Sequence, residues 1–201
     1  WERFVAAGHW ATHRVPAAWD AAVDVVLSFY ALEHVRDPRD FLRTVRRLLK
    51  PGGTFYFIVP NTYANVADFV VADHINHFSA PSLRTMLGHA GFEALEVDAE
   101  SHDAAFIVVA RMRAHPAATL PDPVVVDALR PRVADMARFW SDAAQRVRTF
   151  EAALASARFG HFGEHPVDQF RTGALFHLID HACARLAHFV EHVARMRVVP
   201  V

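Results

Sequence analysis

The apolar positions in the first part of the chain follow two patterns, continuous runs and helical spacing. Residues 21–29, AAVDVVLSF, form a continuous run that is typical of a strand covered on both faces in a parallel sheet. Asp37 and Pro38 then open a segment with helical spacing, which the residues Pro51 to Gly53 should end. Residues 54–60, TFYFIVP, form a second apolar run. The pattern predicts a β-α-β unit with a right-handed crossover between parallel strands.

The following segment predicts a loop, a helix and two antiparallel strands. Residues 61–79 are rich in Asn, Tyr, Asp and His, which indicates a loop. Ser79 is a suitable helix cap, and the helix should end near Gly88 to Gly91. Residues 93–100 alternate in polarity, residues 104–112 are apolar, and the short link SHD between them favours an antiparallel pair. The predicted fold class is therefore α/β, with an antiparallel strand at the edge of the sheet.

The second part of the chain has a different pattern. Prolines mark residues 113–130 as a linker, and residues 131–201 have apolar positions that alternate steps of three and four. The first seam consists of Val133, Met136, Trp140, Ala143, Val147, Phe150 and Leu154, and the second of Leu175, Ile179, Ala182, Leu186, Phe189, Val193 and Met196. A glycine-containing turn separates the seams, so we expect an antiparallel helical hairpin.

Composition narrows the class of protein. The 201 residues are 53% hydrophobic and 21% charged, which is typical of a globular protein. The net charge is −1 without a basic block, so we expect no nucleic-acid partner and no anionic membrane partner. No apolar run approaches the roughly 20 residues that cross a bilayer. The one cysteine, Cys183, excludes an internal disulfide and favours a cytoplasmic location.

Polar and titratable side chains follow both predicted parallel strands. Ser28 to His34 come at the end of the first strand, and Asn61 to Asn65 at the end of the second. In open α/β sheets, ligands bind beyond the carboxyl ends of the strands, so these residues should line a cleft. The alternative is structural: Glu33 caps a local turn, and His34 packs against the following helix.

Two stretches resemble a known family. The stretch DVVLSFYALEHVRDPRDFLRTVRRLLKPGGTFYFIVPN resembles the fourth and fifth strands of a class I S-adenosylmethionine-dependent methyltransferase, and HINHFSAPSLRTMLGHAGFE resembles its later segment. The resemblance covers residues 20–112 and implies that residues 1–112 form a partial Rossmann-like sheet. The family's glycine-rich cofactor loop and ribose-binding acid have no counterpart in the chain. The chain is therefore either the C-terminal part of a methyltransferase, which we favour, or a methyltransferase that has lost its cofactor site. In both cases we expect the chain alone to bind S-adenosylmethionine weakly or not at all.

The resemblance also implies roles for residues in the expected cleft. Ser28, Phe29 and Tyr30 would border the methionine end of the cofactor S-adenosylmethionine, and Glu33, Asn61 and Tyr63 are candidates for contact with the substrate. In some relatives that methylate polyphenolic rings, a glutamate three residues before Glu-His helps to hold a divalent cation. Tyr30 occupies that position here, so we expect no metal.

A general base is needed if the methyl acceptor carries a proton. Histidine is suited to that role near neutral pH. His77 and His74 in the loop DHINHF are the main candidates, and His34 is a third. The alternative is an ordinary loop that anchors Phe78.

The histidines His177, His181, His188 and His192 share one face of a predicted helix with charged residues, which indicates a solvated face and not a metal site. The sequence thus predicts an enzyme that transfers a methyl group from S-adenosylmethionine to a small-molecule or sugar acceptor. Its helical hairpin should either cover the acceptor cleft or form a homodimer. The alternative is a non-catalytic binding or assembly module that pairs with a partner through the hairpin.

Overall fold

A computed structural model describes residues 4–6, 8–12, 14–117, 120 and 122–154. The chain divides into two compact units, one made of Trp1–Asp68 and Asp73–Pro121 and the other of Phe69–Ala72 and Asp122–Val201. The second seam of the expected hairpin, the four histidines beside it and Cys183 lie outside the described residues. The hairpin as a whole therefore stays a prediction.

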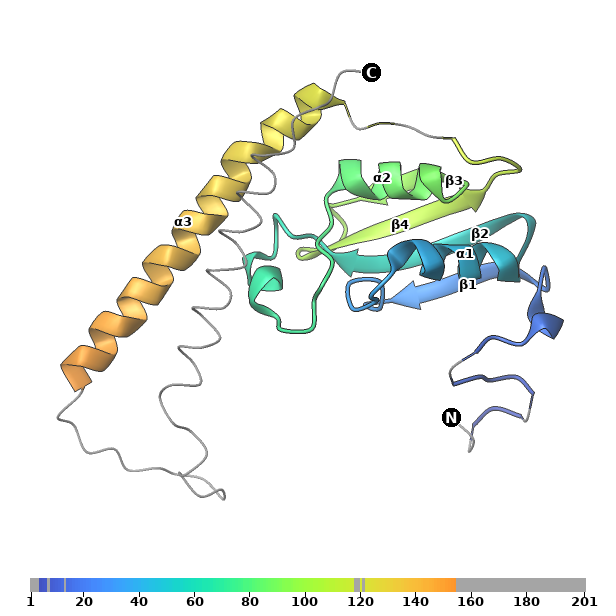
Figure 1. Ribbon diagram of the computed structural model, residues 1–201, viewed down its shortest axis with the longest axis horizontal. Coiled ribbons are helices and arrows are strands. Elements are labelled where there is room, and N and C mark those ends of the chain that lie inside the picture. The colour runs from blue at the N-terminus through green and yellow to red at the C-terminus, as the bar shows by residue number, and fades with distance from the viewer. Residues whose placement is uncertain (1–3, 7, 13, 118–119, 121, 155–201) are drawn as a thin grey trace. The chain divides into compact units, whose positions relative to one another are not determined.

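The first unit contains a four-stranded mixed sheet (Figure 1). The strands are β1 (Val23–Phe29), β2 (Leu49–Pro60), β3 (Phe92–Asp98) and β4 (Ala105–Met112), and their order in the sheet is β1-β2-β4-β3. Strands β1 and β2 are parallel, with Phe29 opposite Ile58, and the other two pairings are antiparallel. The predicted α/β fold, its β-α-β unit and its antiparallel pair are confirmed.

Two helices cover one face of this sheet, α1 (Pro38–Leu48) and α2 (Ala80–His89) (Figure 1). Both begin where the sequence predicts. The Asp37 side chain accepts hydrogen bonds from the backbone N–H groups of Arg39 and Asp40, and Ser79 forms a capping box with Ser82. Each helix has a proline in its first turn, where no hydrogen bond is lost.

The core lies between these helices and the sheet. Alternate side chains of β2, namely Phe55, Phe57 and Val59, are fully buried there, and the Phe55 and Phe57 rings stack with their centroids 4.5 Å apart. The other main members of the core are Leu42 and Val45 of α1, Leu83 and Leu87 of α2, and Phe92, Phe106 and Val108 of β3 and β4. Each large side chain contributes about 1.5–3 kcal/mol on full burial, so this layer stabilises the edge of the sheet where the polar loops leave.

The opposite face of β1 differs from the sequence prediction. Val25, Leu27 and Phe29 are 51%, 60% and 52% exposed, although the run of apolar residues predicts a strand covered on both faces. The physical reason is that α1 and α2 lie on the same face, so within the described part β1 is covered on one face only (Figure 1).

Two element boundaries also differ. Strand β2 begins at Leu49, directly after α1, and passes through Gly52 at φ +77°, where the parallel register with β1 shifts. In the second unit, α3 (Pro123–Leu154) begins inside the stretch predicted as a linker, because the Asp122 side chain accepts a hydrogen bond from the Val124 N–H and the proline suits a first turn.

Part of the first predicted seam can be followed along α3. Val133 and Met136 are buried, whereas Phe150 is 65% exposed. Pro131 lies inside the helix. Among the described residues, no helix combines the length and the hydropathy that a bilayer-spanning segment needs.

Candidate functional site

The polar residues after β1 and β2 meet at one edge of the sheet, within the first unit. Because Phe29 pairs with Ile58, the turn after β1 and the loop after β2 start side by side. Tyr30 turns the chain with a left-handed φ of +48°, and its N–H donates to the Ile58 carbonyl at 3.0 Å. The expected convergence of Ser28 to His34 with the second loop is therefore a feature of the parallel register.

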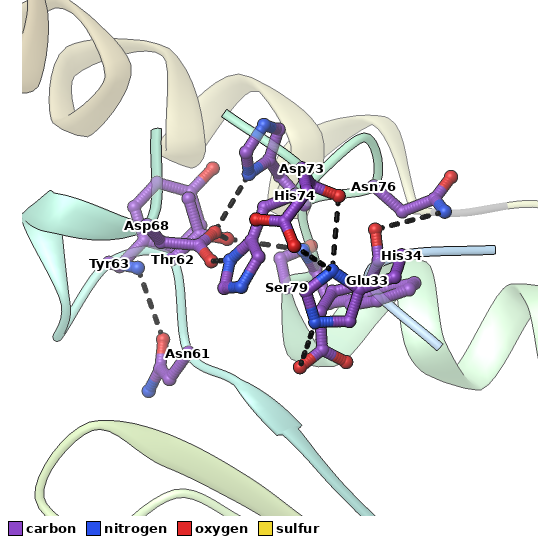
Figure 2. A network of polar contacts seen from close by, with 12 residues as sticks. Glu33, His34, Asn61, Thr62, Tyr63, Asp68, Asp73, His74, Asn76 and Ser79 are labelled. Atoms are coloured by element: carbon purple, nitrogen blue, oxygen red, sulfur yellow. Dashed lines mark hydrogen bonds and ion pairs between the residues drawn. The ribbon is translucent and has the colours of Figure 1, made fainter. Parts of the chain in front are cut away.

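The end of this loop is bound to the turn by backbone contacts (Figure 2). The N–H groups of Ile75 and Asn76 both donate to the Glu33 carbonyl at 3.0 Å. The Asn76 side-chain amide donates to the carbonyls of Leu32 at 3.1 Å and Val35 at 2.7 Å. These bonds hold residues 74–77 beside residues 32–35, so histidines about 40 positions apart in the sequence become neighbours.

Asp68 is the carboxylate that orients the loop histidines. It is fully buried and accepts hydrogen bonds from His74 Nδ1 at 2.6 Å, His77 Nδ1 at 2.7 Å and Thr62 Oγ1 at 2.9 Å. Burial by itself raises the pKa of the Asp68 carboxyl, but the hydrogen bonds from His77, His74 and Thr62 outweigh it and hold this pKa below its usual value. Asp68 is therefore a stable anion that fixes the tautomer and orientation of both rings.

Sequence reasoning missed Asp68 and Thr62. The short segment VADFV, residues 66–70, forms a 3-10 helix, and nothing in its pattern indicates that the aspartate turns inward. The one sequence signal for an Asp–His contact is an acidic residue a few positions before two histidines, in a loop without periodic hydrophobic residues.

Glu33 is the second buried carboxylate, and its environment differs from that of Asp68 in hydrogen bonding. It is 1% exposed, and neither side-chain oxygen has a hydrogen-bond partner among the residues that the structure describes. Burial raises the pKa of the Glu33 carboxyl, and the backbone of Glu33, His34 and His74 offset this in part. Glu33 contributes its backbone carbonyl to the loop contacts, so its side chain does not cap the turn.

His34 and His74 lie beside this carboxylate (Figure 2). His34 Nε2 is 3.8 Å from Glu33 Oε1, and His34 Nδ1 is 3.1 Å from the backbone oxygen of Asp73. The two imidazole rings meet edge to face, with centroids 4.7 Å apart. Ligand-type atoms of Glu33, His34 and His74 all lie within 4.8 Å of one another, so these three residues could hold a metal ion, which the sequence did not lead us to expect.

The remaining predicted site residues are spread along the same edge. Ser28 is buried in β1, whereas Phe29 and Tyr30 are exposed, and the Tyr30 hydroxyl lies 3.2 Å from His102 Nε2. The Asn61 side chain is buried and accepts a hydrogen bond from the Tyr63 N–H at 3.2 Å, so it shapes the start of the loop. None of these contacts brings Ser28, Asn61 or Tyr63 to the carboxylate of Glu33.

The alternative prediction for this loop, that it anchors Phe78, is also supported. Phe78 is buried in the core, and its N–H donates to Thr62 Oγ1 at 3.1 Å. The loop therefore both anchors Phe78 and presents the histidines. A separate groove of about 910 Å³ lies between α1 and α2, and its lining includes Arg39, Arg43 and His89 but none of the predicted site residues.

Comparison with known proteins matches the first part of the chain to methyltransferases. Residues 5–97 match the family model described as a methyltransferase domain. A probable S-adenosylmethionine-dependent methyltransferase of Mycolicibacterium smegmatis is 38% identical over 77 residues, which cover 37% of this chain and 30% of that protein. A ubiquinone biosynthesis O-methyltransferase of Caulobacter vibrioides is 53% identical over 38 residues, covering 19% of this chain and 15% of that protein. The matched segments thus span less than a third of these curated relatives.

Solved structures overlap with about half of the chain. A putative S-adenosylmethionine-dependent methyltransferase of Listeria monocytogenes aligns over 47% of this chain and 63% of its own, at 17% identity and a TM-score of 0.40. A Burkholderia thailandensis 1,6-didemethyltoxoflavin N1-methyltransferase with bound S-adenosylhomocysteine aligns over 49% of each chain, at 19% identity and a TM-score of 0.38. The family model and the curated relatives thus support a class I S-adenosylmethionine-dependent methyltransferase domain in residues 5–97.

Proposed function

We propose that the native protein transfers a methyl group from S-adenosylmethionine to a hydroxyl group of a small molecule or sugar, and that His77 is the general base. The single observation that carries this proposal is the bond between His77 Nδ1 and the buried Asp68 carboxylate at 2.7 Å. A histidine held in this way has a fixed tautomer, with Nε2 as the basic nitrogen.

The chemistry assigned to the chain's own residues is proton transfer and positioning. When bound, S-adenosylmethionine would supply the methyl group as a sulfonium, with a neutral thioether as the leaving group. The acceptor oxygen forms the new C–O bond and loses its proton to His77 Nε2. The negative charge of Asp68 stabilises the imidazolium that results. Most of the remaining rate effect would come from aligning the acceptor with the sulfonium.

The hydroxyl acceptor is the finer part of the proposal. An alcohol or phenol must lose a proton on methylation, which gives a base a function in the reaction. The relative from Caulobacter vibrioides is named an O-methyltransferase, which supports the same choice. Ser28, Phe29 and Tyr30 would border the cofactor, and Glu33, Asn61 and Tyr63 the acceptor. We further propose a cytoplasmic location, in keeping with the single cysteine, and a homodimer formed through the helical hairpin.

The test is turnover by the native protein with radiolabelled S-adenosylmethionine and a panel of phenols and sugars. We expect His77→Ala to lower kcat by about 10²–10⁴-fold, as removal of a general base does. His89→Ala changes an exposed histidine on α2 and is the matched control. Turnover of His77→Ala equal to that of the parent would contradict the assignment.

A further inference from the structure

We propose that Glu33, His34 and His74 bind a divalent transition-metal ion. Their ligand-type atoms already lie within 4.8 Å of one another. An ion with bonds of about 2.0–2.2 Å would bring such atoms to roughly 3–3.5 Å apart. The approach required is small, and His34, which is the exposed member of the three, has room to make it.

Glu33 gives the first independent reason. A buried carboxylate without a hydrogen-bond partner is costly, and folded proteins rarely keep one unless it has a ligand or a function. Glu33 is 1% exposed, and neither of its oxygens has a partner in the described part of the chain. A cation between Glu33 and the two imidazoles would satisfy it.

The contacts of the two histidines give the second reason. His74 is bonded to the buried Asp68 through Nδ1 at 2.6 Å, and His34 Nδ1 faces the backbone oxygen of Asp73 at 3.1 Å. Metal-binding histidines commonly make this kind of bond through the nitrogen that does not bind the ion, to a carboxylate or a backbone carbonyl. In both rings Nε2 is then the nitrogen that would bind the metal, and His34 Nε2 is already the atom nearest to Glu33, at 3.8 Å.

The donor set indicates the class of ion. Two imidazoles and one carboxylate suit Zn²⁺, Co²⁺ or Fe²⁺ better than Mg²⁺ or Ca²⁺, which prefer oxygen ligands. Three protein ligands also leave a coordination position open, as catalytic sites do. If the proposed function holds, the acceptor hydroxyl could occupy that position, but the binding of the ion itself does not depend on it. The site includes His74 and does not need a ligand at Tyr30.

The experiment must separate this site from other histidines. The sequence has histidine pairs four residues apart at His177 and His181 and at His188 and His192, which could bind metal weakly. All measurements therefore use a background protein with His181→Ala and His188→Ala. The metal-free background protein is titrated with Zn²⁺ against a competing chelator, and with Co²⁺ as an optical probe, in the absence of S-adenosylmethionine and acceptor.

We expect one equivalent of Zn²⁺ in the background protein, and affinity lower by at least about 100-fold in Glu33→Gln, His34→Ala and His74→Ala, since loss of even an outer partner costs 10–100-fold. His77→Ala is the matched control, because His77 binds the same Asp68 but is not among the three ligands. The Zn²⁺ affinity of His77→Ala should fall by less than about tenfold.

Two results would overturn the proposal: unchanged affinity in Glu33→Gln, or a loss in His77→Ala as large as that in His74→Ala. Circular dichroism identifies any variant that fails to fold. If a histidine variant fails to fold, the Zn²⁺ affinity of the near-isosteric Glu33→Gln variant still tests the proposal. Because binding is measured without substrates, its failure would leave the assignment of His77 as the base untouched.

Discussion

Asp68 and Glu33 are both buried carboxylates at the same edge of the sheet, but they differ in their hydrogen bonds and in the direction of their pKa shifts. Asp68 accepts three hydrogen bonds, from His74, His77 and Thr62, and its pKa is lowered. Glu33 has no hydrogen-bond partner in the described part of the chain, and its pKa is raised. The two differ in what surrounds them and not in exposure, at 0% and 1%.

This difference in hydrogen bonding suggests that Asp68 serves stability and Glu33 serves ligand binding. A satisfied buried anion holds its neighbours in place, so Asp68 should contribute to the folding of residues 61–79. An unsatisfied buried carboxylate costs free energy in the protein without ligand, so Glu33 is there at the expense of stability. Substitutions at the two positions should therefore have opposite profiles, with large effects on unfolding at Asp68 and large effects on ligand binding at Glu33.

The largest effect on stability is expected from Asp68→Ala. Three donors would lose their buried acceptor, and each unsatisfied group costs about 1–3 kcal/mol. We expect the free energy of unfolding to fall by at least about 3 kcal/mol in urea denaturation. Asp73→Asn, at a side chain that is 76% exposed, is the control and should change it by no more than about 0.5 kcal/mol. A loss at Asp68 no larger than at Asp73 would remove the distinction between the two carboxylates.

Thr62→Val should have an intermediate effect. The hydroxyl donates to Asp68 and accepts from the Phe78 N–H, so valine removes both bonds while keeping the shape of the side chain. We expect a loss of about 1–3 kcal/mol, because a buried N–H and one acceptor position of Asp68 are left without a partner. Thr44→Val on α1, where the hydroxyl bonds an exposed helix carbonyl, is the comparison and should cost less than about 0.5 kcal/mol. Equal losses in the two variants would show that Thr62 does not link Asp68 to the core.

Glu33→Gln should have the smallest effect on stability, with a sign that depends on pH. No hydrogen bond is lost, so without metal at low pH the change should be less than about 1 kcal/mol. The pKa of Glu33 is raised above 4.5 in the folded state, so the folded protein holds this proton more tightly than the unfolded chain does. The parent's stability from this group is therefore present below pH 4.5 and is lost as pH rises through the folded pKa.

Glutamine does not titrate, so Glu33→Gln should become more stable relative to the parent as pH rises above 4.5. Urea denaturation of both proteins in a chelator, between pH 4 and pH 8, measures this difference. A parent that instead gains stability over the variant with rising pH would mean that Glu33 has a favourable partner when ionised.

Much of the fold follows from local signals in the sequence. The apolar runs predict β1 and most of β2, and Asp37 and Ser79 mark the starts of α1 and α2 because their side chains bond the first N–H groups. The exposed face of β1 was not predictable, since an apolar run indicates that a surface is suited to burial but not what covers it.

The site was predicted only in outline. Parallel register brings Glu33, His34 and the loop with His74 to one edge of the sheet, and the order of the elements is enough to infer this. The inward turn of Asp68 and its bonds to two histidines depend on the conformation of an irregular loop, which has no period in the sequence. The sequence led us to expect no metal because Tyr30 stands where some relatives have a metal-binding glutamate. The packing of His74 against His34 instead brings three possible ligands together.

The most direct test of the contrast between the two carboxylates is a carbon-13 NMR titration of their side chains in the metal-free protein, assigned with Glu33→Gln and Asp68→Asn. Both resonances are followed in one sample as pH changes, so the two groups are compared under identical conditions. We predict that Glu33 titrates above 4.5 and Asp68 below 3.8. A Glu33 carboxyl that titrates at or below 4.5, or an Asp68 carboxyl that titrates above 3.8, would contradict the account.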